Sequence, residues 1–149
     1  MLGFKVIAPG ALSLLQDEGR FGQLRLGLTN GGPMDFESFY WAQRLCGNDS
    51  SATVIEVSVG GLALEALSET VIAITGADMP TTINGQSVSE WRSHKIKAGD
   101  RLQMGFAQCG LRAYLAVSGG FDVTPVFGSS ATVVREGLGG LDGQALQEG

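Results

Sequence analysis

Four carboxylates and one guanidinium stand out because each lies in or beside a short apolar segment. Asp17, Asp35, Glu56 and Asp78 supply the carboxylates, and Arg20 follows Asp17 within one loop. An arginine can form two parallel hydrogen bonds to a carboxylate, so this set is able to bind a small polar or anionic ligand. A simpler interpretation is a surface turn in which Asp17 and Arg20 pair and contribute little stability. The set does not by itself specify a reaction.

The glycine-rich turn Asn30–Pro33 leads directly into the one convincing helix of the sequence. Apolar residues recur at helical period within Asp35–Cys46, which predicts one principal helix there. Asp35 is suited to cap its N-terminus, and Gly47 is suited to the left-handed position after its end. The first N–H groups of a helix attract anions, so the turn is a candidate anion site. A turn followed by a capped surface helix is the plainer alternative.

Most standard catalytic patterns are missing from the sequence. His94 is the single histidine, which excludes a histidine-rich metal site and would make any Ser-His-Asp triad depend on it alone. The sequence holds no CxxC pair, no GxxxxGK[ST] phosphate loop and no GxSxG nucleophile elbow. We therefore expect no metal site, and the catalytic residues stay unassigned.

Composition and charge narrow the class of protein. The chain has a net charge of −5, a pI of about 4.7 and no basic run, which argues against binding to nucleic acid or to an anionic membrane surface. No apolar run is long enough to span a bilayer. The two cysteines, Cys46 and Cys109, fit a reducing compartment better than a disulfide framework, so we expect a cytoplasmic protein.

Glycine is unusually frequent, with 23 in 149 residues, and it separates many short apolar runs. This pattern predicts a mainly β protein of roughly eight to ten strands, arranged as a sandwich or a barrel. One such strand is expected over Leu24–Leu28, where leucines alternate with other residues. Two hairpins are expected, one at Gly60-Gly61 between Thr53–Val59 and Leu62–Leu64, and one at Asn84-Gly85.

Several short motifs occur in a fixed order along the chain. They are Gln16-Asp17-x-Gly19-Arg20-x-Gly22, Gly31-Gly32-Pro33-Met34-Asp35, Gly47-Asn48, Thr75-Gly76-Ala77-Asp78, Tyr114–Gly120 and Gly139–Leu146. In this order they resemble the motifs of the biotin-dependent carboxyltransferase family, which includes the C subunit of 5-oxoprolinase, the kinase-inhibitor antagonist KipA and allophanate hydrolase subunit 2. Two positions depart from the family pattern, because Ser130 and Gln144 stand where the family commonly has arginine.

The resemblance implies a cyclophilin-like β-barrel with its site in a cleft between two lobes. Because family members continue beyond the position of Gly149, it also implies that residues 1–149 are a single domain, the truncated N-terminal half of a carboxyltransferase or KipA-like subunit. Arg20 and the glycine turn are expected to hold an anionic group, with Asp35 capping the helix or orienting Arg20. By motif, the substrate-binding candidates are Gln16, Asp17, Arg20, Gly31, Gly32, Pro33, Met34, Asp35, Glu56 and Asp78.

The resemblance leaves three functions open. The first is a subunit of an ATP-dependent 5-oxoprolinase-type amide hydrolase or of a biotin-dependent urea- or allophanate-type carboxyltransferase, acting with a KipI-like subunit and an ATP-using subunit. No cofactor is expected on this chain itself, with ATP on a partner subunit or carboxybiotin as the delivered group. The second is a KipA-like regulatory module that sequesters a KipI-like kinase inhibitor, and the third is an inactive fragment. In isolation the chain is expected to lack activity and to self-associate through an uncovered face.

Overall fold

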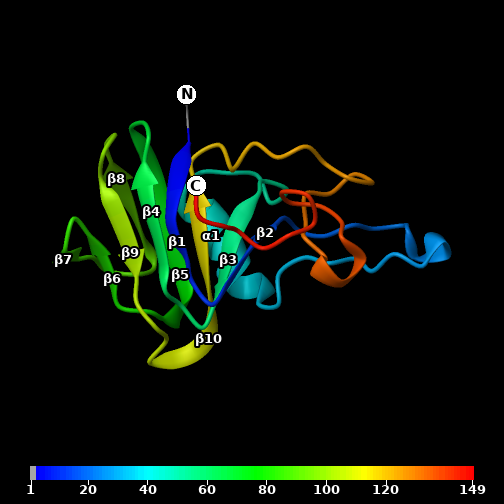
Figure 1. Ribbon diagram of the computed structural model, residues 1–149, viewed down its shortest axis with the longest axis horizontal. Coiled ribbons are helices and arrows are strands. Elements are labelled where there is room, and N and C mark those ends of the chain that lie inside the picture. Colours follow the sequence, from blue (N-terminus) through cyan, green and yellow to red (C-terminus); the bar gives the residue numbers. More distant parts are fainter. Residues whose placement is uncertain (1–2) are drawn as a thin grey trace.

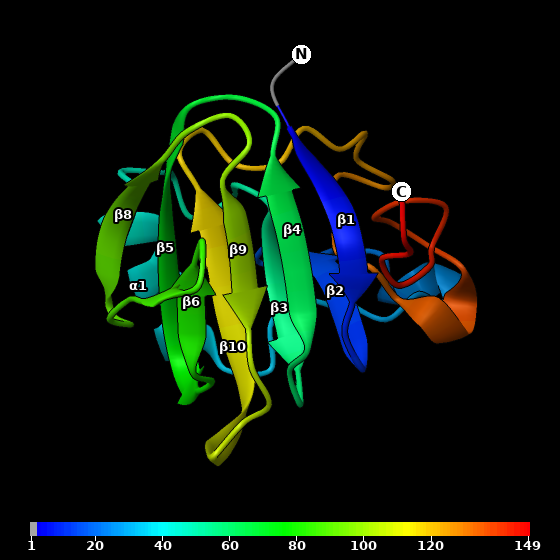
Figure 2. The same cartoon turned by 60° about the vertical axis from the view of Figure 1, so that its left-hand side comes forward.

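Residues 3–149, which the computed structural model describes, form two facing β-sheets with one helix packed on the outside (Figures 1 and 2). The first sheet contains, in spatial order, β1 (Phe4–Pro9), β4 (Leu62–Ala66), β9 (Arg101–Met104), β6 (Thr81–Ile83) and β7 (Gln86–Ser87). The second contains β2 (Leu12–Gln16), β3 (Val54–Ser58), β10 (Cys109–Val117), β5 (Thr70–Asp78) and β8 (Arg92–Ile96). The helices are α1 (Phe36–Leu45) and the short 3-10 turns η1 (Leu24–Leu26) and η2 (Val134–Glu136).

All neighbouring strands in both sheets are antiparallel. The mainly β fold with one principal helix is therefore confirmed. The strand ladders within residues 3–149 form two separate sheets and do not close into one continuous barrel.

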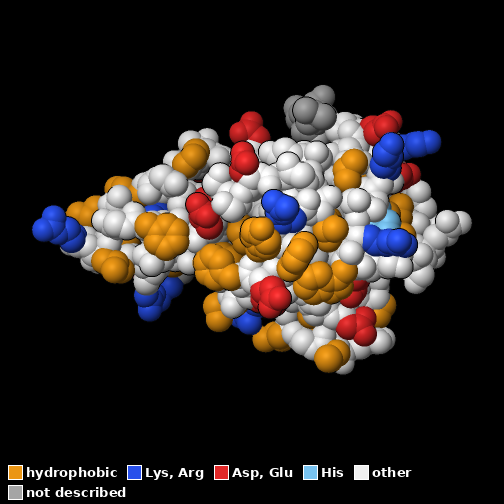
Figure 3. All heavy atoms as spheres, turned by 180° about the vertical axis from the view of Figure 1, so that it is seen from behind, with side chains coloured by type: hydrophobic (Ala, Val, Ile, Leu, Met, Phe, Trp, Pro, Cys, Tyr) orange, Lys and Arg blue, Asp and Glu red, His pale blue; other side chains and the backbone are white. Residues whose placement is uncertain are grey.

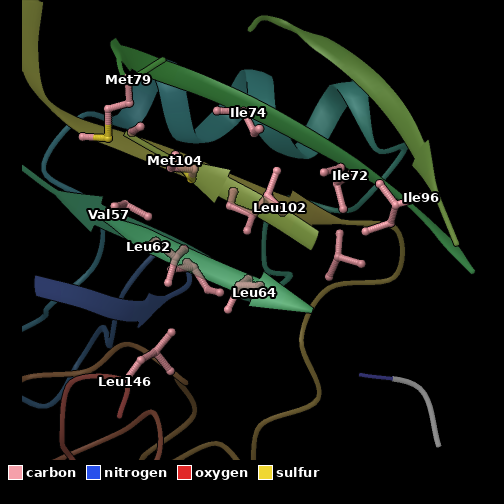
Figure 4. Packing of buried hydrophobic residues seen from close by; sticks show 14 of the residues in the cluster. Val57, Leu62, Leu64, Ile72, Ile74, Met79, Ile96, Leu102, Met104 and Leu146 are labelled. Atoms are coloured by element: carbon pink, nitrogen blue, oxygen red, sulfur yellow. The ribbon is translucent and has the colours of Figure 1, made fainter. Parts of the chain in front are cut away.

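The larger hydrophobic cluster lies between the two sheets. Alternate strand residues point inward, as Leu62, Leu64 and Ile72 do (Figure 4). A smaller cluster lies between α1 and the outer face of the second sheet. Burying an aliphatic side chain contributes about 1.5–3 kcal/mol relative to leaving it exposed, so the sheets and the helix are held mainly by these two layers.

Helix α1 begins and ends where the sequence predicts. Asp35 is its N-cap, and the carboxylate accepts a hydrogen bond from Ser38 N at 3.1 Å. Gly47 follows the helix in the left-handed conformation, with φ of 69°. The buried side of the helix presents Phe39 to Tyr114, with ring centroids 6.2 Å apart and an interplanar angle of 80°. The cap therefore sits next to the outer face of the second sheet.

The C-terminal segment, residues 126–149, runs back along the first two strands, β1 and β2 (Figure 1). Gly149 and Val6 exchange two backbone hydrogen bonds, at 3.1 and 3.0 Å. Leu146 N donates to the carbonyl of Ser13 in β2 at 2.9 Å. The segment thereby links the edge of the first sheet to the edge of the second, which gives the fold a barrel-like form on this side.

The strand expected over Leu24–Leu28 is wrong. Residues Leu24–Leu26 form the turn η1 in a loop that projects from the body of the molecule (Figure 1). Leu24 is 70% exposed, and Gly27 has a left-handed φ of 75°, which ends any extended chain. Alternating leucines make a half-buried strand only where a sheet supplies backbone partners, and this loop has no neighbouring strand among residues 3–149.

The hairpin expected at Gly60-Gly61 is also wrong, because β3 and β4 belong to different sheets. The chain crosses between the sheets here, and Gly60 forms an isolated bridge with Phe106. A Cβ on Gly60 would lie 2.2 Å from the carbonyl oxygen of Gly105, so glycine permits a close backbone approach rather than a two-residue turn. The hairpin expected at Asn84-Gly85 is confirmed, since it joins β6 to β7.

Candidate functional site

Asp17 is buried at the end of β2 and contacts a loop more than a hundred residues later in the sequence. Its Oδ1 accepts hydrogen bonds from Gly19 N at 2.9 Å and from Ser129 Oγ at 2.6 Å. Its Oδ2 accepts from Ser130 N at 2.7 Å. Buried carboxylates need such donors, so Asp17 is satisfied by the protein and holds the later loop against β2.

Arg20 is 1% exposed and binds the same loop. Its Nε donates to Val126 O at 2.8 Å, and its Nη2 donates to Ser129 O at 3.2 Å and to Ala131 O at 3.1 Å. No ion pair within residues 3–149 joins Arg20 to Asp17, so the surface pair considered from the sequence is not formed. These bonds engage two of its three guanidinium nitrogens, and its action as a ligand fork stays a prediction.

Gln16 connects this buried contact to the glycine turn. Its Nε2 donates to Thr132 O at 3.2 Å, and its Oε1 accepts from Gly32 N at 3.2 Å. Gly31 has φ of 65°, and a Cβ there would lie 3.0 Å from Val133 Cγ2. The turn therefore requires glycine both for its conformation and for its close approach to the C-terminal segment.

Three elements meet at Glu56, which is 3% exposed. After the buried Pro33, Met34 N donates to Glu56 Oε2 at 2.9 Å, and the hydroxyl of Tyr114 donates to the same oxygen at 2.8 Å. The Tyr114 oxygen in turn accepts a hydrogen bond from Asp35 N at 2.8 Å. Because Tyr114 lies directly opposite Glu56 in the β3–β10 ladder, both side chains stand on the sheet face that α1 covers.

Arg112 lies beside this cluster on β10. Its Nε is 3.6 Å from Glu56 Oε1, and its side chain is 30% exposed. A buried carboxylate needs a charge partner as well as donors, and Glu56 has both. Burial, followed by the Glu56 carboxylate, raises the pKa of Tyr114 above its ordinary value, so the phenol stays protonated and donates.

An open pocket of about 410 Å³ lies beside the N-terminus of α1. The turn before the helix, the ends of β5 and β10 and the segment before β8 all contribute to it. The residues that matter for its chemistry are Asp35, Ser38, Asp78, Glu90, Trp91 and Gly110. Two residues predicted from separate motifs, Asp35 and Asp78, therefore line one pocket.

Two carboxyls of this pocket, Asp35 and Glu90, have pKa values shifted in opposite directions. The hydrogen bond from the Ser38 hydroxyl lowers the pKa of Asp35, although partial burial opposes it. Burial raises the pKa of Glu90, and the charge of Asp78 adds to this, while the hydrogen bond from Met79 N opposes it. Asp35 therefore favours the ionised form and Glu90 holds a proton more readily. Two carboxyls that differ in this way are suited to proton transfer.

The predicted site residues thus fall into two groups. The group at the buried contact with residues 126–133 consists of Gln16, Asp17, Arg20, Gly31 and Gly32. The group around Tyr114 and the pocket consists of Met34, Asp35, Glu56 and Asp78, with Pro33 joining the two in the chain. Asp35 caps the helix, which was one of the two roles considered for it.

Sequence reasoning missed Tyr114, Arg112 and Glu90 as site residues. Tyr114 could have been found, because it is a polar side chain in an apolar strand, as Glu56 is. Arg112 lies two residues before Tyr114, so strand alternation places both on one face. Glu90 had no local signal, since its place in the pocket depends on how the chain returns from β7 to β8.

Neither a metal centre nor a membrane-spanning helix is found within residues 3–149. No group of three or more histidine, cysteine, aspartate or glutamate side chains is arranged to hold a metal ion there. Among the same residues, no helix combines the length and apolar character needed to cross a membrane.

Comparison with known proteins gives consistent matches over almost the whole chain. A family model described as carboxyltransferase domain, subdomain A and B, matches residues 26–149. The C subunit of the Escherichia coli 5-oxoprolinase is 38% identical over 146 residues, which cover 97% of this chain and 47% of that protein. The urea amidolyase of Saccharomyces cerevisiae is 39% identical over 146 residues, 97% of this chain but 8% of that protein.

Solved structures agree with these sequence matches. The crystal structure of the K. lactis urea amidolyase superposes with a TM-score of 0.96 at 39% identity, over 98% of this chain and 9% of that chain. This chain therefore spans about half the length of its bacterial relative and less than a tenth of the fungal ones.

Proposed function

Because the chain belongs to the carboxyltransferase family of subdomains A and B, we propose that it is one part of a multi-subunit enzyme acting on a small amide or urea compound. In the favoured form it corresponds to the N-terminal half of a 5-oxoprolinase-type subunit, and the complex opens 5-oxoproline to glutamate. In the related form the complex transfers a carboxyl group from carboxybiotin to a urea-type acceptor. Either complex also contains a KipI-like subunit and an ATP-using subunit.

The observation that carries this proposal is the convergence of separate motifs at one pocket. Asp35, which follows the glycine turn, and Asp78, at the end of β5, both line the pocket, and Glu56 of β3 lies buried behind it. Tyr114 connects two of them, since its oxygen bonds both to Asp35 N and to the Glu56 carboxylate. A purely structural contact would not require Asp35 and Asp78 to border an open pocket.

The pocket supports amide chemistry through its carboxyls. An amide or urea presents N–H donors and a carbonyl acceptor. Asp35, whose pKa is lowered, is suited to accept from an N–H group, and Glu90, whose pKa burial raises, is the better suited of the two to donate a proton to a carbonyl or to a leaving nitrogen. ATP is assigned to a partner, because this sequence has no phosphate-binding loop.

The exposed apolar residues favour a second candidate, the KipA-like module that sequesters a KipI-like kinase inhibitor. Hydrophobic side chains are numerous on the face that carries α1 and the projecting loop (Figure 3). We call the following exposed residues the apolar surface: Phe21, Leu24, Leu26, Met34, Phe36, Tyr40 and Trp41. Exposed apolar side chains in this number are typical of a surface that binds another protein.

A reconstitution experiment separates these functions from each other and from an inactive fragment. The chain is mixed with candidate KipI-like and ATP-using subunits, and glutamate formed from 5-oxoproline and ATP is measured. The variant Asp35→Asn, which keeps the helix cap, is expected to abolish product formation, whereas Asp49→Asn, in the exposed turn after α1, is the matched control. Tight partner binding without glutamate or carboxylated urea would reject the enzyme and leave the regulatory module. An absence of both binding and product would indicate an inactive fragment.

A further inference from the structure

Arg112 presents a guanidinium beside the Glu56 cluster without a hydrogen bond to any described residue. Its nearest charge contact, from Nε to Glu56 Oε1, is 3.6 Å, which is longer than a hydrogen bond. The side chain remains 30% exposed, whereas that of Glu56 is 4% exposed. The guanidinium therefore lies between a buried carboxylate and the surface.

This geometry differs from that of an arginine whose whole role is to neutralise Glu56. Such an arginine commonly makes two parallel hydrogen bonds to the carboxylate. Here the other carboxylate oxygen of Glu56 is filled by Met34 N and the Tyr114 hydroxyl. Glu56 therefore orients Arg112 by charge through the buried Nε, while the two terminal nitrogens of the guanidinium are left for another acceptor.

Arg112 also lies next to the pocket. Gly76 lines the pocket and packs against the Arg112 backbone, since a Cβ on Gly76 would lie 2.5 Å from the Arg112 carbonyl oxygen. A continuous chain of contacts leads from the pocket residue Asp35 through Tyr114 and Glu56 to Arg112. Arg112 does not line the pocket itself, and its guanidinium supplies a positive charge beside the carboxyls that do.

Building on the proposed function, we propose that Arg112 binds a carboxylate group of the small molecule that enters this pocket. The ligand class is a planar amide or urea compound that carries a carboxylate. Its N–H groups face the carboxyls of the pocket, and its carboxylate accepts two hydrogen bonds from Arg112. Glu56 acts as a positioning residue, because it fixes the direction of the guanidinium.

Two matched pairs of probes test the proposal by binding rather than by turnover. Each pair compares an acid with its neutral amide: 5-oxoproline with 5-oxoprolinamide, and allophanate with biuret. Binding to the full chain is measured by calorimetry or by ligand-observed NMR, and the pairs distinguish a lactam acid from an N-carboxylated urea. We expect the acid of at least one pair to bind better than its amide.

Arg112→Gln and Arg112→Lys are expected to weaken binding of that acid by roughly tenfold or more and to leave binding of the amide unchanged. Arg112→Lys keeps a positive charge beside Glu56, so the test survives if Arg112→Gln fails to fold. Arg101→Gln is the control, because Arg101 pairs with Glu65 on the other sheet. Equal binding of acid and amide by the unsubstituted chain, including no binding of either, overturns the proposal, and so does unchanged binding in both Arg112 variants.

The proposed function can fail separately. A chain that prefers the acids through Arg112 but gives no product with any partner would refute the enzyme and support the carboxylate site. Product formation that is unchanged by Arg112→Lys would support the enzyme and refute the carboxylate site.

Discussion

Tyr114→Phe is the most informative single substitution, because it removes one oxygen atom and leaves the buried ring in place. That oxygen donates to the Glu56 carboxylate and accepts from Asp35 N, each at 2.8 Å, and Tyr114 is 0% exposed. The substitution therefore tests whether the hydroxyl joins the helix cap to β3. The matched control is Tyr40→Phe, since Tyr40 is 46% exposed on the outer side of α1.

The expected magnitude follows from the two lost bonds. A hydrogen bond to a charged acceptor is worth about 1.5–3 kcal/mol, and a buried N–H left without a partner costs about 1–3 kcal/mol. Because Met34 N and Arg112 still support Glu56, we expect Tyr114→Phe to lower the free energy of unfolding by about 2–4 kcal/mol. Tyr40→Phe should stay within about 0.5 kcal/mol of the original chain.

Urea unfolding at neutral pH, followed by circular dichroism, measures both variants. A second test measures how the free energy of unfolding changes at alkaline pH. The pKa of Tyr114 is raised in the folded state, so its contribution is fully present below the unfolded value near 10 and is lost as the pH rises above it. Tyr114→Phe should therefore unfold with a weaker dependence on pH above 10 than Tyr40→Phe. A loss below about 0.5 kcal/mol in Tyr114→Phe would refute this account of the cluster.

Three further predictions concern the cap, the cysteines and the apolar surface. Asp35→Ala should lose about 0.5–2 kcal/mol of unfolding free energy, and Asp35→Asn should lose much less. Because the pKa of Asp35 is lowered in the folded state, the loss in Asp35→Ala should be complete above about pH 4 and should vanish as the pH falls through the folded-state pKa. Urea titrations at several pH values would measure both. Iodoacetamide at pH 8 should label exposed Cys109 well before Cys46, whose pKa burial raises to about 11, and equal labelling in peptide mass spectra would contradict this. The isolated chain should self-associate through the apolar surface, and light scattering that shows a monomer at high concentration would count against it.

Local patterns predicted the elements whose partners are close in the sequence. The stripe of α1, the Asp35 cap and the Asn84-Gly85 hairpin need only neighbouring residues, and all three were predicted correctly. The strand over Leu24–Leu28 was predicted incorrectly, because a strand depends on a partner that local alternation does not reveal. The hairpin predicted at Gly60-Gly61 was wrong for a related reason, since Gly60 permits a close contact with Gly105, which lies in another part of the fold.

In the candidate site, too, the sequence identified single residues but not the contacts between distant ones. Motifs picked out Asp35, Glu56 and Asp78, but they did not reveal that two of these line one pocket. Arg20 looked like a free fork in the sequence, whereas in the structure its Nε and Nη2 donate to carbonyls about 110 residues away. Glu90 illustrates the remaining limit, because only the three-dimensional path of the chain brings it to the pocket.

The return of the C-terminal segment to the first strands has a consequence for the order of events during synthesis. Ser130 N bonds to Asp17 across 113 residues, and Gly149 bonds to Val6 near the opposite end of the chain. Domains dominated by such distant pairings fold on the slow scale of milliseconds to seconds. During synthesis, β1 and β2 leave the ribosome before residues 126–149, so the strand edges that this later segment covers are exposed until it has been made.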